Sequence, residues 1–254
     1  MSQSVARALS LLDRVANGVG TLGALAEAEG VHKSTVLRLL RVLESEGFVH
    51  SDGEHRYVLG PHLFRLAQQA LDSFEVRVVA APRLRRLRDE IGQTIHLAVL
   101  DGTVATYVDK LEPRQAPVRM ASRIGKSAAL HSTAVGKVLL AGLDPAERAE
   151  LAAVLDYPRF TERTPGSPDE LLAEVARVAD RGWATDHAEN ETFINCVGAP
   201  IHGADGRTLA AVSVSVPDVL LPYDGVLELV PSLVAAAADV SRDCGYRTGG
   251  EDTP

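Results

Sequence analysis

The sequence has few of the residues that cross-link or anchor a chain. Its 254 residues include two cysteines, Cys196 and Cys244, and no CxxC pair, which argues against a disulfide framework and against a structural zinc site. No apolar run approaches the ~18 residues of a membrane helix. The N-terminal stretch lacks the small-residue cleavage site of a signal peptide. We therefore expect a cytoplasmic protein that does not associate with membranes.

Positive charge is also scarce. The net charge is −8, and residues 1–70 contain seven of the 26 Lys and Arg residues and seven of the 34 Asp and Glu residues. This segment is therefore neutral, and the whole negative excess lies in the rest of the chain. Any attraction to nucleic-acid phosphates would have to come from the local placement of basic side chains.

The N-terminal segment predicts three helices with helix-turn-helix spacing. An apolar stripe at helical spacing runs from Val5 to Ala16, and a short helix follows Thr21, its expected N-cap. Gly30 can supply the positive φ of the turn into a third helix. The apolar stripe of this third helix is Val36, Leu39, Leu40 and Leu43. A short helix, a turn with glycine and a longer helix are typical of a helix-turn-helix.

The free face of the third helix carries basic and hydroxyl side chains. A recognition helix reads base edges with residues near its N-terminus and contacts phosphates with Arg, Lys and hydroxyl groups. For the helix alone, a solvated charged face is the alternative. The candidate DNA contacts up to this point are Thr21, Lys33, Ser34, Thr35, Arg38 and Arg41.

The stretch FVHSDGEHRYVL, residues 48–59, predicts two short strands in a tight hairpin about Asp52-Gly53. A hairpin directly after such a helix is the wing of a winged helix-turn-helix. From it, His55 and Arg56 could reach the adjacent backbone or the minor groove. The wing favours DNA binding over a merely solvated face, and we predict a winged helix-turn-helix domain over residues 1–60.

Helical spacing resumes after the hairpin. It predicts a linker helix over residues 61–74, continued by a second helix from about Glu75 to Glu90. The second helix contains Arg77, Arg83, Arg85, Arg86 and Arg88. Because no aromatic residues interleave with these arginines, we expect a solvated or subunit-facing surface and not a second nucleic-acid surface.

After Gly92 the periodicity changes to that of strands. The predicted strands are the two halves of TIHLAVLDGTVATYVDKL, VRMAS at 118–122, INCVGAPI and TLAAVSVSVP. Helices are expected to begin near Ser132, Asp144 and Ser167, the last two with capping boxes. A closing helix is expected to bury Val226, Leu229, Val230, Leu233, Val234 and Ala237. This order predicts an α+β sensor-like domain over residues 75–246, followed by a disordered tail over 247–254.

Three C-terminal elements resemble the IclR family of bacterial transcriptional regulators. GKSAALHSTAVGKVLLA, residues 125–141, is similar to the family's G-x-x-x-P-L-H-x-T-A-x-G-K-x-x-L-A element. RGWATDHAENETFINCVGAPI, residues 181–201, is similar to R-G-Y-A-x-D-x-E-E-x-x-x-G-x-x-C-x-A-A-P-I, and AAVSVSVP, residues 210–217, to A-A-x-S-x-S-x-P. The resemblance covers nearly the whole chain. It implies a GAF-like effector-binding domain with a pocket for a small metabolite, often a carboxylate or an aromatic acid.

The resemblance also implies which residues bind the effector: Leu130, His131, Ala134, Val135, Gly136, Asp186, Phe193, Cys196, Ser213 and Ser215. Ser213 and Ser215 alternate along one strand, so both hydroxyls face the same side. The start of the helix over 132–142 offers unpaired N–H groups to a carboxylate. Ala129, Ala188 and Phe193 depart from the family pattern, so we expect an effector that differs in size or shape from those of other members.

The same residues allow other interpretations. His131, Cys196 and Asp186 could suggest a thiol hydrolase or a zinc site. A thiol inside an apolar strand is by default buried and unreactive, so we expect no enzyme activity, no metal and no cofactor. Ser213 and Ser215 could instead be small residues packed beneath a helix, and Cys196 could be core. Lys137 could lie at the surface, structure its helix or contact the ligand.

Together these patterns predict an effector-responsive transcriptional regulator, a repressor rather than an activator. It would act as a homodimer or a dimer of dimers on a palindromic or pseudo-palindromic operator in double-stranded DNA. The alternative is a metabolite-binding sensor module whose winged domain mediates protein–protein contact. A steep salt dependence of DNA binding distinguishes the two.

Overall fold

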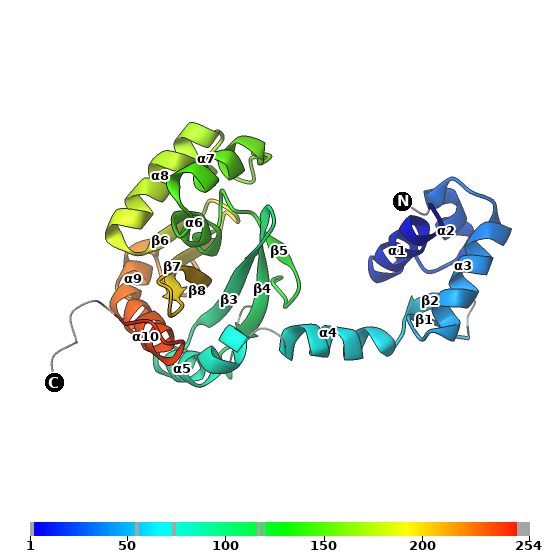
Figure 1. The fold of residues 1–254 in the computed structure, drawn as a ribbon, viewed down its shortest axis with the longest axis horizontal. Coiled ribbons are helices and arrows are strands. Elements are labelled where there is room, and N and C mark those ends of the chain that lie inside the picture. The colour runs from blue at the N-terminus through cyan, green and yellow to red at the C-terminus, as the bar shows by residue number, and fades with distance from the viewer. Residues whose placement is uncertain (1–2, 54–55, 73–74, 116–117, 119, 248–254) are drawn as a thin grey trace. The chain divides into compact units, whose positions relative to one another are not determined.

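The computed structural model describes residues 3–53, 56–72, 75–115, 118 and 120–247. The chain divides into two compact units, one within residues 1–73 and the other within residues 74–254 (Figure 1). Among the described residues, no helix is long and apolar enough to cross a membrane.

The first unit begins with three helices and continues with a short hairpin and a further helix. These elements are α1 (Gln3–Ala16), α2 (Leu22–Glu29), α3 (Lys33–Ser45), β1 (Val49–Ser51), β2 (Tyr57–Leu59) and α4 (His62–Asp72). The three helices and the hairpin predicted from the sequence are confirmed. The predicted linker helix corresponds to α4.

The turns between these helices form where the sequence predicts them. The Thr21 side chain caps α2, its Oγ1 accepting a hydrogen bond of 3.3 Å from the Ala24 backbone N–H. Gly30 ends α2 in the left-handed region, at φ 63°. Of the predicted stripe on α3, Val36, Leu40 and Leu43 are buried and Leu39 is partly buried. The core of the unit is therefore built from one face of each helix.

The hairpin differs from the predicted tight turn. The strands β1 and β2 pair from Val49–Leu59 to Ser51–Tyr57, and the Asp52 N–H donates to the Arg56 carbonyl at 2.9 Å. The connection is therefore longer than a two-residue turn. On the other side of β2, the Tyr57 N–H donates to the Gly20 carbonyl at 2.8 Å. A Cβ at Gly20 would lie 2.8 Å from the Tyr57 carbonyl oxygen, so this close approach requires glycine.

The second unit is built on a six-stranded sheet in the order β5-β4-β3-β8-β7-β6, in which every neighbouring pair is antiparallel. The strands are β3 (Thr94–Asp101), β4 (Val104–Leu111), β5 (Ser127–Ala128), β6 (Ala184–His187), β7 (Ile194–His202) and β8 (Thr208–Pro217). The helices are α5 (Glu75–Ile91), α6 (Ala134–Ala141), α7 (Pro145–Val154), α8 (Pro168–Arg181), α9 (Tyr223–Leu227) and α10 (Val230–Asp243).

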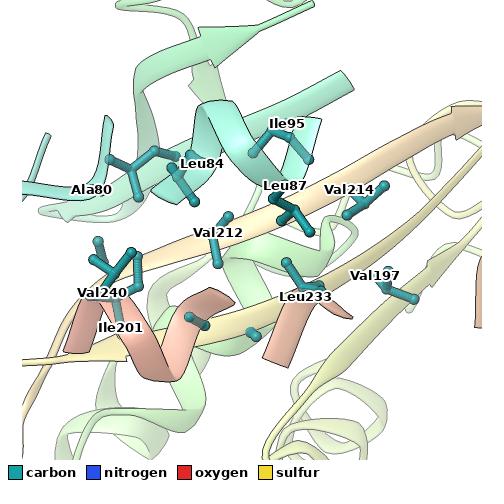
Figure 2. Packing of buried hydrophobic residues seen from close by; sticks show 14 of the residues in the cluster. Ala80, Leu84, Leu87, Ile95, Val197, Ile201, Val212, Val214, Leu233 and Val240 are labelled. Atoms are coloured by element: carbon teal, nitrogen blue, oxygen red, sulfur yellow. The ribbon is translucent and has the colours of Figure 1, made fainter. Parts of the chain in front are cut away.

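The helices of this unit cover both faces of the sheet. On one face, α5 and α10 pack on β3, β7 and β8, where Leu84, Leu87 and Leu233 meet Val212 and Val214 (Figure 2). On the other face, α6 packs on the same strands, and α8 packs against α6 (Figure 1). The result is the α+β fold that the sequence predicts, in three layers.

The alternation of side chains along β8 determines which face of the sheet its two serines lie on. Val212, Val214 and Val216 belong to the core beneath α5 and α10. The residues between them, Ser213 and Ser215, therefore point to the α6 side, because successive side chains of a strand face opposite ways. Both serines are buried. The predicted shared face of the two hydroxyls is confirmed.

One predicted strand of the second unit is wrong, and two strands were not predicted. The described residues of 118–122 form no strand, since the Lys110 ammonium binds the carbonyls of Met120 and Ser122 at 3.0 and 2.8 Å. The third strand is β5, which pairs with β4. The strand β6 was not predicted, because its four residues alternate poorly between apolar and polar types.

One of the two predicted capping boxes and the closing helix also need correction. Asp144 forms the complete predicted capping box with Glu147. At Ser167 the box is incomplete, because the Glu170 carboxylate accepts from the Gly166 N–H at 2.8 Å. The closing segment is two helices, α9 and α10, with a proline in the first turn of α10. Val234, predicted to be buried, is 37% exposed.

Candidate functional site

The exposed face of α3 carries three cations. Lys33, Arg38 and Arg41 are exposed, and within the described part of the chain none of them makes a hydrogen bond or an ion pair. Ser34 is exposed and Thr35 is half-buried on the same helix. These five residues, which we call the α3 surface, are therefore exposed or half-buried, and its three cations are free to meet phosphates.

A histidine whose role was not predicted from the sequence lies at the start of this surface. His32 is the N-cap of α3, and its Nδ1 accepts from the Ser34 N–H at 3.3 Å. The same nitrogen lies 2.8 Å from the Ser34 Oγ. Histidine is not among the common N-cap residues, so no sequence pattern indicated this role. The Ser34 hydroxyl is consequently held at the helix start.

The remaining predicted DNA contacts are tied to the scaffold. The Thr21 oxygen is occupied as the cap of α2. The Arg56 guanidinium donates to the Gly18 carbonyl at 3.3 Å, and the Arg56 backbone N–H donates to Asp52 at 3.2 Å. His55 lies outside the described residues. Arg56 is exposed, so the wing presents one cation of known position to solvent.

The second unit contains a small cavity of about 40 Å³ on the α6 side of the sheet. This volume is well below that of most sites for drug-sized ligands. Six of the ten predicted effector positions line it: Ala134, Val135, Asp186, Cys196, Ser213 and Ser215. The lining residues that were not predicted are His96, Tyr107, Met120, Ser122, Thr133, Asn190, Glu191 and Ile194.

The other four predicted positions do not line the cavity. Leu130 is buried in the core. A Cβ added at Gly136 would lie 2.5 Å from the Leu130 Cα, so these two positions pack tightly against each other. The His131 ring packs against two aromatic rings, and its Nε2 lies 3.2 Å from the Pro158 carbonyl. Phe193 is 56% exposed.

The start of α6 offers backbone donors to the cavity. The Thr133 Oγ1 caps the helix by accepting from the Gly136 N–H at 3.1 Å, and it donates to the Ala129 carbonyl at 2.7 Å. The N–H groups of Ala134 and Val135 make no hydrogen bond to any described residue. A helix N-terminus with free N–H groups carries a partial positive charge and can hold one carboxylate.

A chain of hydrogen bonds crosses the floor of the cavity. The Cys196 Sγ donates to the Ser215 Oγ at 3.2 Å. The same oxygen lies 3.2 Å from His96 Nδ1, and His96 Nε2 lies 2.8 Å from the Ser122 Oγ. Burial lowers the pKa of His96 to about 3, aided by Lys110, so the imidazole is neutral. Burial raises the pKa of the Cys196 thiol, which makes it a poor nucleophile.

Asp186 is the buried acid of the cavity. Its Oδ1 accepts from the backbone N–H groups of Glu189 at 2.8 Å and Asn190 at 3.3 Å. Burial raises the pKa of Asp186 to about 7, and these hydrogen bonds limit the rise. Near neutral pH its carboxyl group can therefore both donate and accept hydrogen bonds.

Lys137 holds the loop that carries these residues. It is 1% exposed, so it does not lie at the surface. Its ammonium donates to the Thr185 carbonyl and to the Glu189 carboxylate, each at 2.7 Å. Thr164 fixes the same loop by donating to the Glu189 carbonyl at 2.6 Å. Lys137 therefore structures the cavity wall and is not among the lining residues.

No group of three or more His, Cys, Asp and Glu side chains among the described residues is arranged to hold a metal ion. Of His131, Cys196 and Asp186, the set that could suggest a hydrolase or zinc site, only Cys196 and Asp186 are brought together. Asp186 and Cys196 are register partners on β6 and β7, whereas His131 bonds outside the cavity. Within the described residues, the Cys196 thiol donates to the Ser215 hydroxyl, and nucleophilic catalysis would require a base in that place.

Comparison with known proteins places both units in one family. The family models "IclR helix-turn-helix domain" and "Bacterial transcriptional regulator IclR C-terminal" match residues 4–53 and 68–242. The HTH-type transcriptional regulator XynR of Escherichia coli is 33% identical over 247 residues, which cover 96% of this chain and 98% of XynR. The transcriptional repressor IclR of Escherichia coli is 31% identical over 244 residues, 94% of this chain and 89% of the relative. The Thermotoga maritima IclR crystal structure has a TM-score of 0.80 at 31% identity, covering 97% of this chain and all of that one.

Proposed function

Since the chain belongs to the IclR family of bacterial transcriptional regulators, we propose that it is a repressor whose binding to operator DNA is modulated by a small metabolite. The metabolite, a carboxylate or an aromatic acid, binds in the cavity of the second unit. Operator DNA is bound in the cytoplasm by α3 and the wing. The proposed effector contacts are the cavity-lining residues, and the proposed DNA contacts are the α3 surface with Arg56 and His55.

The observation that carries the DNA-binding half is the set of unpaired cations on α3. Lys33, Arg38 and Arg41 are exposed without an acidic partner, although acidic residues outnumber basic ones in the chain as a whole. Free cations on a recognition helix release counterions when they meet phosphates, which drives association. The naming of one relative as a repressor supports repression over activation.

The proposed assembly follows from how such helices reach DNA. A homodimer, or a dimer of dimers, would place two α3 helices in successive major grooves about 34 Å apart on a palindromic or pseudo-palindromic operator. The effector can alter this assembly only by binding one arrangement more tightly than another. The free N–H groups of Ala134 and Val135 support a carboxylate as part of the effector.

The test is a gel-shift titration with the intergenic DNA beside the gene that encodes this chain. The variant Arg38→Ala should weaken binding by about 1–3 kcal/mol if the side chain contacts a base, with a larger loss on the specific site than on unrelated DNA. If it contacts a phosphate, the loss should be similar on all sequences. The matched control is Arg207→Ala, which removes an exposed arginine from the second unit.

Two results would contradict the proposal. Wild-type affinity of Arg38→Ala together with wild-type affinity of Arg41→Ala would show that α3 does not face DNA. Affinity that barely changes between low and high salt would show that phosphates are not neutralised, and it would favour a sensor module whose winged domain contacts protein.

A further inference from the structure

The cap of α3 differs in chemistry from the other side-chain caps of the described helices. The helices α2, α6, α7 and α8 are capped by the side-chain oxygens of Thr21, Thr133, Asp144 and Ser167. The cap of α3 is a ring nitrogen, the Nδ1 of His32, which accepts from the Ser34 backbone N–H at 3.3 Å. An imidazole nitrogen can accept a hydrogen bond only when it carries no proton. The cap therefore requires the tautomer of His32 that is protonated at Nε2.

This tautomer determines how the Ser34 hydroxyl is oriented. The Ser34 Oγ lies 2.8 Å from the same Nδ1 of His32. Because this nitrogen has a lone pair and no proton, the hydroxyl must donate its proton to the ring. No other hydrogen bond joins the Ser34 Oγ to a described residue. The hydroxyl has therefore used its one proton, and its oxygen presents only lone pairs to a partner.

Both side chains face solvent in the first turn of the helix that is proposed to enter the major groove. His32 and Ser34 are exposed, and residues near the N-terminus of a recognition helix are the ones that contact base edges. A serine hydroxyl that rotates freely can pair with donors or with acceptors on the bases. A hydroxyl that presents only lone pairs does not suit a phosphate, because phosphate oxygens are acceptors as well. The donors in the major groove are the amino groups at adenine N6 and cytosine N4.

We propose that the Ser34 oxygen accepts a hydrogen bond from the amino group of an adenine or a cytosine in the major groove, and that His32 is the positioning residue that fixes this polarity. The inference rests on the proposed function and names a residue that selects the operator sequence. Lys33, between the two, has a different part. A Cβ added at Gly23 would lie 3.9 Å from the Lys33 Nζ, so the ammonium lies over the first turn of α2, where we expect it to meet a phosphate.

The first test is a selection of binding sites from a pool of randomised DNA duplexes, made with the full-length chain and read by sequencing. In each half-site, one position should prefer adenine or cytosine over guanine or thymine by about 3- to 10-fold, the effect of one hydrogen bond. The variant Ser34→Ala should lose this preference and keep those at other positions. The matched control is Ser45→Ala, at an exposed serine at the other end of α3, which should keep them all.

Two outcomes of the selection would overturn the proposal. If the position that Ser34→Ala relaxes prefers guanine or thymine in the wild type, the hydroxyl donates to a base acceptor. If Ser34→Ala selects the same sequences as the wild type and binds all of them more weakly, or as tightly, the hydroxyl does not contact a base.

Variants at His32 test its positioning role. His32→Gly removes the ring at little cost to the helix, because glycine is tolerated as an N-cap. The Ser34 hydroxyl can then rotate, and the preference for adenine or cytosine should fall below about 2-fold. His32→Asp supplies an acceptor-only cap and should restore the preference, although its negative charge lowers affinity for all sequences. Thermal unfolding confirms that each variant is folded. A preference that is unchanged in His32→Gly, or that His32→Asp does not restore, would overturn the role of His32.

A modified duplex tests the amino group itself. In the selected site, the amino group of the preferred base is replaced by hydrogen, with purine in place of adenine or 2-pyrimidinone in place of cytosine. Wild-type affinity should fall about 3- to 10-fold, whereas Ser34→Ala should bind both duplexes equally. An equal loss in both proteins would show that the modification weakens the duplex and that Ser34 does not contact the amino group.

Failure of this inference can be separated from failure of the proposed function. Lys33→Met should weaken binding to all sequences and lower the slope of affinity against salt by about 1, while the preference for adenine or cytosine remains. Loss of that preference in Lys33→Met would assign the base contact to Lys33 and overturn the proposal. Selected sequences with steep salt dependence but without an amino-specific position would refute the inference alone. If no sequence is selected and binding is independent of salt, both the inference and the proposed function are refuted.

Discussion

The α3 surface and the cavity present their polar groups in opposite ways. On α3, the cations Lys33, Arg38 and Arg41 are exposed and unpaired. Around the cavity, Lys137 is buried and paired with Glu189, and the polar groups that line the cavity include hydroxyls, a neutral imidazole and two acids. The first arrangement suits a highly charged partner that exchanges with counterions. The second suits a small ligand that must match a fixed set of donors and acceptors.

The contrast also concerns stability. Exposed cations on a helix contribute little to folding, because water and salt screen them. A buried ion pair costs desolvation free energy and is tolerated only when each partner is present. Variants of the α3 surface should therefore change DNA binding without changing stability, whereas variants of the cavity frame should change both.

The largest expected effect comes from Lys137→Met. Removing the ammonium leaves the Glu189 carboxylate buried without its partner, which should destabilise the second unit by about 3–5 kcal/mol. The measurement is the free energy of unfolding from urea titration. The double variant Lys137→Met with Glu189→Met, which removes both charges, should recover most of this loss. The control is Lys126→Met, at an exposed lysine. A single variant as stable as the wild type would mean that the pair does not hold the cavity loop.

The next effect concerns the pH dependence of stability at Asp186. Burial raises its pKa from 3.8 to about 7 in the folded chain. A raised pKa means that the folded state favours the protonated acid, so the contribution is fully present below about pH 4 and is lost as pH rises through about 7. Asp186→Asn imitates the protonated acid and keeps an oxygen for the loop N–H groups.

The stability of Asp186→Asn relative to the wild type should therefore increase between pH 5 and pH 8. The gain is about 3 kcal/mol, since two pH units lie between pH 5 and the folded pKa of about 7 and each corresponds to about 1.4 kcal/mol. Urea titrations at the two pH values measure it, with the exposed Asp156→Asn as the control. A relative stability that is the same at both pH values would show that the carboxyl group ionises as easily in the folded chain as in the unfolded one.

The sequence predicted the parts of the two regions that depend on periodicity. The apolar stripe of α3 and the alternation of Ser213 and Ser215 follow from the helical and strand repeats, and the structure has both. The similarity of 125–141 to a family motif identified the start of α6 at the cavity. Leu130 and Gly136 belong to that motif and pack tightly against each other, so they were included among the effector contacts although they lie outside the lining.

The missing cavity residues could not be read from the same patterns. His96 and Tyr107 come from the β3–β4 hairpin, whose alternation places every second side chain on the cavity face, but the sequence does not say which strand will neighbour β8. Ser122 lies in an irregular segment that Lys110 holds by its carbonyls. This contact depends on the single side chain of Lys110, which binds a segment further along the chain, and no local periodicity of the sequence predicts it.

The smallest predicted effect is a change in the stability of the first unit at Thr21. It tests whether a residue of the scaffold can be separated from the residues that contact DNA. Thr21 was predicted both to cap α2 and to contact DNA, and its oxygen is already an acceptor for the Ala24 N–H. Thr21→Ala should therefore destabilise the first unit by about 1 kcal/mol, while Thr21→Ser, which keeps the cap, should leave stability nearly unchanged. Well below the unfolding temperature, gel shifts should show the same operator affinity for both variants, because α3 and its cations are intact. A weaker affinity for folded Thr21→Ala, with Thr21→Ser unaffected, would mean that the hydroxyl donates to DNA while it accepts from the helix, and the capping threonine would then join the α3 surface.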